Sequence, residues 1–241
     1  MRAETRHQLK EDRFSRATIE AAEATVHWSQ EHQSKLFAAA VAVIAIAAIA
    51  IGGFYYMKSR DEKASFDLSD ALRTMEAQLR PPGTPAQPGF PSYESSADRA
   101  TAARKQFQAI ADKYPHTKTA KMAVYFVGVT SAQLGDTVAA EHNLQETANS
   151  SDSPLASLGK FALASIYRGE KKDAQAVDLY KQLVDKPTEL VSKVSAQLEL
   201  ASLYESEQKP DEAKKIYLDI QKENPKSQAY SVAQRRLADL K

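Results

Sequence analysis

The longest apolar segment of the chain runs from Leu36 to Met57 and reads LFAAAVAVIAIAAIAIGGFYYM, without a charged residue. With a rise of about 1.5 Å per residue, a helix of this length reaches roughly 33 Å, which is enough to cross the hydrocarbon core of a bilayer. A helix also satisfies the backbone polar groups that lipid cannot. We therefore predict a single transmembrane helix over residues 36–57, in contact with the lipid bilayer.

Two alternatives to a membrane anchor are a signal peptide and the buried helix of a soluble protein. A signal peptide usually has an apolar region of about 7 to 15 residues after a short basic start. Here the apolar run is longer and follows a polar tail of residues 1–35, which we expect to be helical. Lys35 on one side and Phe54, Tyr55, Tyr56 and Lys58 on the other suit the two membrane interfaces. The pattern favours the anchor.

The orientation of this anchor is weakly specified by charge. The tail has six basic residues offset by six acidic ones, whereas Lys58, Arg60 and Lys63 follow the apolar run closely. Only Lys and Arg near the span act strongly in the positive-inside rule, so local charge leaves the orientation open. The basic residues of the whole tail mildly favour a cytoplasmic N-terminus.

Beyond the apolar segment the pattern lacks the alternation of strands and contains an internal repeat. Three pairs of matching residues lie 37 positions apart: Tyr167 and Tyr204, Ala176 and Ala213, Tyr180 and Tyr217. A more divergent earlier copy matches at a spacing of 36, with Gly128 in the place of Ala164 and Ala201. Three matching offsets indicate a repeated structural unit.

The repeated positions have a physical meaning. A small residue lets two antiparallel helices approach, an aromatic residue on the same face fills the space beside it, and a proline ends the second helix. We therefore predict that the following residues pack the repeats together: Gly128, Ala140, Ala164, Tyr167, Ala176, Tyr180, Ala201, Tyr204, Ala213, Tyr217 and Pro225.

These patterns predict an all-α fold, in which one transmembrane helix precedes an α-solenoid of helix–turn–helix repeats over residues 58–241. A capping helix is expected over 226–241, and a loop rich in proline over 80–93 interrupts the first repeat. The alternative role of this loop is to bind a proline-recognising domain. Helices are expected near 62–79, 95–114, 117–134, 137–150, 155–169, 172–185, 188–206, 210–223 and 226–240.

The spacing of Ala201, Tyr204, Ala213, Tyr217 and Pro225 resembles the tetratricopeptide repeat, and the resemblance covers about residues 100–226. It implies a groove lined by the first helix of each repeat, which contacts ligands through its fifth position. That position falls on an apolar ladder suited to a hydrophobic peptide: Tyr125, Phe161 and Leu198, with Met122, Val129 and Leu158 nearby. Internal packing of the same side chains is the alternative.

Composition narrows the chemistry of the chain. Lys and Arg number 32 against 31 Asp and Glu, which removes the driving force for nonspecific nucleic-acid binding. The chain has no cysteine, and its five histidines form no HExxH pair. Neither a nucleophile elbow nor a phosphate-binding loop is present. We expect a protein that is not an enzyme, without cofactor, metal or small-molecule substrate, and with other proteins as partners.

One span followed by a degenerate repeat domain resembles the family of the ancillary Sec-translocon subunit (YfgM-like proteins). The resemblance lies in architecture, and the proline-rich insertion departs from it. It implies a bacterial inner-membrane protein with a cytoplasmic N-terminus and a periplasmic repeat domain that links the translocon to chaperones or unfolded clients. The alternatives are a structural subunit of another membrane complex without client handling, and an adaptor that faces the cytoplasm.

Overall fold

The computed structural model describes residues 32–85, 89 and 91–240. The chain divides into two units, Met1–Lys58 and Ser59–Lys241. Within the described residues the architecture is helical, with nine helices and one pair of two-residue strands. This agrees with the predicted all-α class. Residues 1–31, most of the predicted helical tail, lie outside the described residues.

Helix α2, Gln33–Met75, contains both the apolar run and the first helix of the repeat domain. The two had been predicted separately, but the intervening residues include neither proline nor glycine, so nothing in the sequence ends the helix between them. Among the described residues, α2 is the one helix long and apolar enough to cross a membrane. Apolar side chains along the run are exposed, including Phe37, Ile44 and Ile49 at 71%, 67% and 75%.

The predicted helix over 62–79 ends earlier, at Met75, because the chain then enters strand β1, Gln78–Leu79. This strand pairs in parallel with β2, Ser92–Tyr93, across the proline-rich insertion. Arg80 closes the base of the insertion by donating to the carbonyl oxygens of Thr84, at 2.8 Å, and Ser92. The insertion is therefore a loop tied at both ends, of which residues 86–88 and 90 lie outside the described part.

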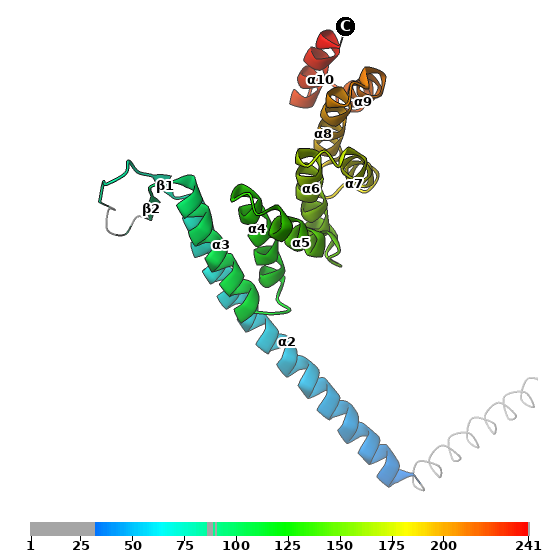
Figure 1. The fold of residues 1–241 in the computed structure, drawn as a ribbon. Helices are drawn as coiled ribbons and strands as arrows, with labels where there is room; N and C mark the ends of the chain where they lie inside the picture. Colours follow the sequence, from blue (N-terminus) through cyan, green and yellow to red (C-terminus); the bar gives the residue numbers. More distant parts are fainter. Residues whose placement is uncertain (1–31, 86–88, 90, 241) are drawn as a thin grey trace, which may run out of the picture. The chain divides into compact units, whose positions relative to one another are not determined.

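Each helix from α3 onward contacts the next along the chain (Figure 1). Their bounds are α3 Ser96–Lys113, α4 Lys118–Gln133, α5 Thr137–Ala148, α6 Ser153–Gly169, α7 Asp173–Asp185, α8 Lys193–Ser206, α9 Pro210–Glu223 and α10 Gln228–Asp239. Helix α8 begins later than the predicted residue 188. Thr188 and Val191 form a turn before it, and the Ser192 hydroxyl accepts the amide of Ser195 as the N-cap.

The first repeat is held together by α2, α3 and the start of α4. Ala64 and Ala71 of α2 are fully buried in a cluster that includes Phe107, whose ring stacks on Phe126 at 4.9 Å. Asp67 of α2 accepts hydrogen bonds from two residues at the end of α3, from the Tyr114 hydroxyl at 2.8 Å and from Lys113 at 3.1 Å. These hydrogen bonds, Tyr114 first, lower the pKa of Asp67.

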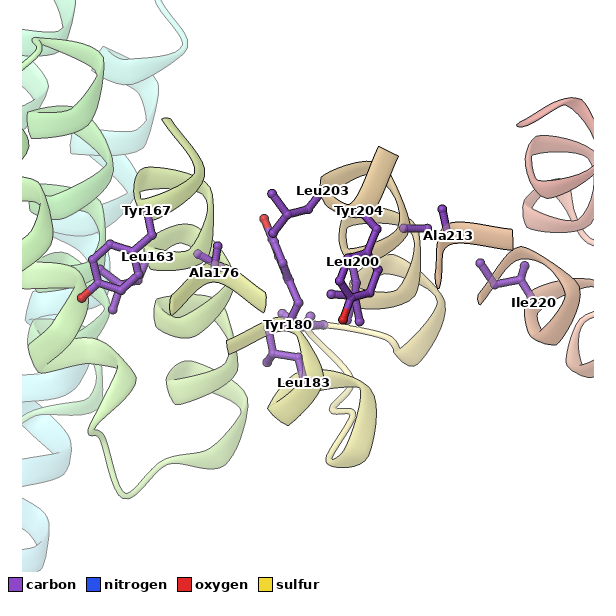
Figure 2. Close-up of a cluster of buried hydrophobic side chains, with 14 of the residues drawn as sticks. Leu163, Tyr167, Ala176, Tyr180, Leu183, Leu200, Leu203, Tyr204, Ala213 and Ile220 are labelled. Carbon is purple, nitrogen blue, oxygen red and sulfur yellow. The ribbon is translucent and has the colours of Figure 1, made fainter. Parts of the chain in front are cut away.

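A second cluster continues through the later repeats to the capping helix α10 (Figure 2). Most of the predicted repeat-packing residues are buried, at 9% exposure or less, and lie on the facing sides of neighbouring helices: Gly128, Ala140, Ala164, Tyr167, Ala176, Tyr180, Ala201, Tyr204, Ala213 and Tyr217. Pro225 is exposed and follows the end of α9 directly. The core of the domain thus consists of two clusters, each built from neighbouring helices.

Close helix approach depends on two glycines. A Cβ atom on Gly128 would lie 2.7 Å from Cγ of Leu144 in α5. A Cβ atom on Gly159 would lie 2.5 Å from the backbone nitrogen of Ala148 at the end of α5. The Gly128 position was expected from the repeat, whereas Gly159 had no place in the repeat pattern.

The turn within each of the three later repeats has one shape. Gly135, Lys171 and Gln208 adopt the left-handed region, at φ of 76°, 59° and 59°. The amide of the following residue donates to the carbonyl oxygen five residues earlier, on Ser131, Tyr167 and Tyr204. This bond is part of the usual left-handed end of a helix. The shared geometry fixes which residues are equivalent between repeats.

Candidate binding surface of the repeat domain

The predicted apolar ladder lies on the first helix of each later repeat. Met122, Tyr125 and Val129 are on α4, whereas Leu158 and Phe161 are on α6 and Leu198 is on α8. All six side chains are half-buried. All but Met122 pack against the second core cluster, so they contribute to the fold and keep part of their surface exposed.

Phe161 shows how the ladder is supported. Its ring meets the ring of Tyr180 on α7 edge-on, with 5.8 Å between centroids and an interplanar angle of 74°. Tyr180 itself is 1% exposed. Such edge-to-face pairs hold aromatic rings in a defined orientation. The ladder position on α6 is therefore rigid on its inner side.

Charge near the ladder is balanced. Arg168 on α6 pairs with Glu199 on α8 at 3.3 Å and donates to the hydroxyl of Ser202 at 3.0 Å. Burial raises the pKa of Tyr125, and it raises the pKa of Tyr180 to about 12 with a smaller contribution from Glu199. Both phenols are thus neutral near physiological pH. The surface favours apolar contact over attraction of a charged ligand.

The described histidines and acidic residues are spread over the helices and turns of the chain. No group of three or more among them is placed to hold a metal ion. His116 and His142 are exposed on separate elements.

A second surface was not anticipated from the sequence. A cavity of about 530 Å³ opens between α3, α4 and α5, and is lined among others by Arg104, Lys105, Gln108, Val127, Ser131 and Asn143. Ser131 is fully buried, and its hydroxyl has no hydrogen-bond partner among the described residues. The available signal was the alignment of the repeats, which places serine where later repeats have tyrosine.

Comparison with protein families gives two matches. Residues 26–187 match a tetratricopeptide repeat-like domain, and residues 195–227 match a tetratricopeptide repeat. A search of curated proteins gave no match. The first match begins ten residues before Leu36 and takes in the whole apolar run, so this run lies within the region that the family describes. This first match covers about two thirds of the sequence, and the chain therefore belongs to the tetratricopeptide repeat-like domain family.

Proposed function

We propose that this protein is a membrane-anchored, non-enzymatic scaffold whose repeat domain binds other proteins through the apolar ladder. The observation that carries the proposal is the partial exposure of aromatic and aliphatic side chains at the same position of successive repeats. Repeat domains of this family generally mediate protein–protein interactions. The ladder would take an extended or helical peptide that offers apolar side chains.

Lipid contact through residues 36–57 is supported by the exposure of that part of α2. None of its most apolar stretch is buried by the rest of the described chain. A core helix of a soluble protein would be mostly covered, and an uncovered apolar surface of this size is costly in water. A bilayer removes that cost without requiring another protein.

For location, we propose the bacterial inner membrane, with the N-terminus in the cytoplasm and the repeat domain in the periplasm. The support is the resemblance in architecture to the ancillary Sec-translocon subunit. On this proposal the ladder links the translocon to periplasmic chaperones or to emerging chains. A structural role in another membrane complex is favoured by the packing of the ladder against the core.

Protease treatment of spheroplasts tests the side of the membrane. The repeat domain should be degraded while the inner membrane is intact, because the protease then reaches the periplasmic face only. Survival of the domain until the membrane is permeabilised would make the periplasmic assignment wrong. Affinity capture in mild detergent then separates the two roles: translocon subunits are expected for the first and absent for the second.

The ladder is tested by Phe161→Glu, with Leu218→Glu as the matched control. Leu218 lies on α9 outside the ladder and is 48% exposed, so it accepts the same charge without touching the proposed surface. We expect Phe161→Glu to lose crosslinks to partners while the domain still melts cooperatively, and Leu218→Glu to keep them. An unfolded Phe161→Glu chain, or unchanged crosslinks, would contradict a binding role for this residue.

A further inference from the structure

The cavity beside Ser131 arises at a position where later repeats carry a tyrosine. Ser131, Tyr167 and Tyr204 occupy equivalent places, since each accepts the backbone amide five residues later, at 3.0, 2.8 and 2.9 Å. At two of these three equivalent positions the side chain is a buried phenol, Tyr167 and Tyr204. The repeat of α4 and α5 places only a serine there. We call the cavity the Ser131 pocket.

The surroundings of Tyr167 show what the equivalent space holds when it is occupied. The Tyr167 hydroxyl donates to Glu141 at 3.1 Å, and the Lys172 ammonium lies 5.2 Å from the ring centroid. Lys172 also pairs with Glu141 at 3.1 Å. The ring is therefore framed by an ion pair, of which the cation lies over its face.

The Ser131 pocket keeps this frame with the charges exchanged. Arg104 of α3 is equivalent to Glu141, and Asp136 is equivalent to Lys172; the two form an ion pair of 3.1 Å. The cation now comes from the preceding helix, and Lys105 adds a second positive charge to the lining. Arg104 thus stands where Glu141 bonds the Tyr167 hydroxyl, and Asp136 stands where Lys172 lies over the ring. The described residues that line the pocket supply no aromatic ring.

The floor of the pocket combines apolar and polar groups. Val127, 4% exposed, contributes an apolar surface, and the fully buried Ser131 hydroxyl finds no hydrogen-bond partner in the part of the chain that the structure describes. An unpaired buried hydroxyl is uncommon in folded proteins. A volume of about 530 Å³ lies within the range of ligand sites. The rim carries Arg104 and Lys105 beside Asp112, so it offers charged donors without a large net charge. Size, apolar floor and these donors together suit the ring and hydroxyl of a tyrosine side chain.

We propose that the Ser131 pocket binds an aromatic side chain, tyrosine by preference, of a partner protein. The ring lies over Val127 in the place that the tyrosine side chain takes in the later repeats, and the Arg104 guanidinium donates to the phenol oxygen as the counterpart of Glu141. The proposal rests on the scaffold role in one respect: the aromatic ring comes from another protein that the repeat domain binds. It is independent of the membrane side and of the apolar ladder.

The direct test uses N-acetyl-tyrosinamide as the probe and the full chain in detergent micelles. Methyl resonances of Val127 report on the pocket, whereas those of Ala213 in the core of α9 serve as an internal reference. We expect a saturable shift of the Val127 methyls in the millimolar range, with no shift at Ala213. N-acetyl-alaninamide, which lacks the ring, should shift neither.

Three variants sharpen the test. Ser131→Tyr supplies the missing ring from the chain itself and should abolish probe binding while raising the melting temperature. Ser165→Tyr makes the same change at an exposed site on α6 and should leave both unchanged. Arg104→Gln should weaken probe binding about two- to fivefold, because the charged donor to the phenol oxygen is lost.

Two results would overturn the proposal: Val127 methyls that do not respond to saturating probe, or probe binding that survives Ser131→Tyr. The titration of the unsubstituted chain decides the matter even if Ser131→Tyr fails to fold. Partner crosslinking from the ladder is measured separately. If Phe161→Glu loses those crosslinks but still binds the probe, both surfaces bind, and they do so independently. If the unsubstituted chain crosslinks to partners but does not bind the probe, the Ser131 pocket is rejected and the ladder is not.

Discussion

Replacing Gly159 by alanine tests the close approach of α5 and α6. The added Cβ atom would lie 2.5 Å from the backbone nitrogen of Ala148 and 2.8 Å from the carbonyl carbon of Thr147. Backbone atoms cannot rotate away. A Cβ atom this close to backbone atoms forces the two helices apart, toward the ordinary contact range that begins at 3.4 Å. A separation of about 0.5 to 1 Å would remove roughly a quarter to a half of the dispersion energy of each contact between α5 and α6.

Overpacking a core typically costs about 1 to 3 kcal/mol, and a clash with backbone belongs at the upper end of that range. Alanine offsets part of the cost, because it is favoured over glycine inside a helix by up to about 1 kcal/mol. The net loss is then about 2 kcal/mol. For a domain of this size the loss corresponds to a fall in melting temperature of about 4 to 8 °C.

The assay is thermal unfolding of the full chain in detergent, followed by far-UV circular dichroism. Gly169→Ala is the matched control, because Gly169 ends the same helix and a Cβ atom there would meet nothing within 4 Å. This control should melt at the same temperature as the unsubstituted chain or slightly above it. The packing argument fails if Gly159→Ala melts no lower than the Gly169→Ala chain.

Three further outcomes follow from local geometry. Lys171→Gly and Gln208→Gly should each raise stability by about 0.5 to 1 kcal/mol in urea unfolding, because both residues adopt a left-handed conformation that costs glycine nothing; unchanged midpoints would contradict this. Tyr217→Phe should lose about 1 kcal/mol with its 2.9 Å hydrogen bond to a carboxylate, whereas Tyr180→Phe, whose hydroxyl has no such bond in the described structure, should be nearly neutral. Asp67→Asn should lose up to about 1 kcal/mol near neutral pH. Because the pKa of Asp67 is lowered in the folded chain, its contribution is complete above the unfolded value of about 3.9 and is lost as pH falls through the lower folded value. The difference between Asp67→Asn and the unsubstituted chain should thus vanish in acid, and a difference that persists there would refute the assignment.

Much of the helical architecture could be read from the sequence because repeat proteins are built from local contacts. Helices near each predicted range are present, since small and aromatic residues at fixed spacing specify which faces meet within a pair. Boundaries were less certain where a turn competes with a helix. The start of α8 depends on Thr188 and Ser192 side chains that bond the backbone, and such competition is not visible in hydrophobic spacing.

For the two candidate surfaces as well, spacing along the chain predicted some features and helix packing decided the others. The positions of the ladder residues on the first helix of each repeat followed from their spacing, but their half-burial did not, because exposure depends on how neighbouring helices pack. Phe161 is supported by Tyr180 from another helix, a contact with no local signature. The Ser131 pocket required three helices and an exchanged ion pair to be in place before a missing tyrosine became a cavity.

By itself, the sequence determined the apolar segment, the repeat period and the residues that recur with it, because each is a property of spacing along one chain. Only the tertiary structure decided that Gly159 is a point of close approach and that Ser131 leaves a cavity instead of a collapsed contact. Both depend on the distance between elements. That distance is the joint result of all the side chains between two helices, and no single repeat position specifies it.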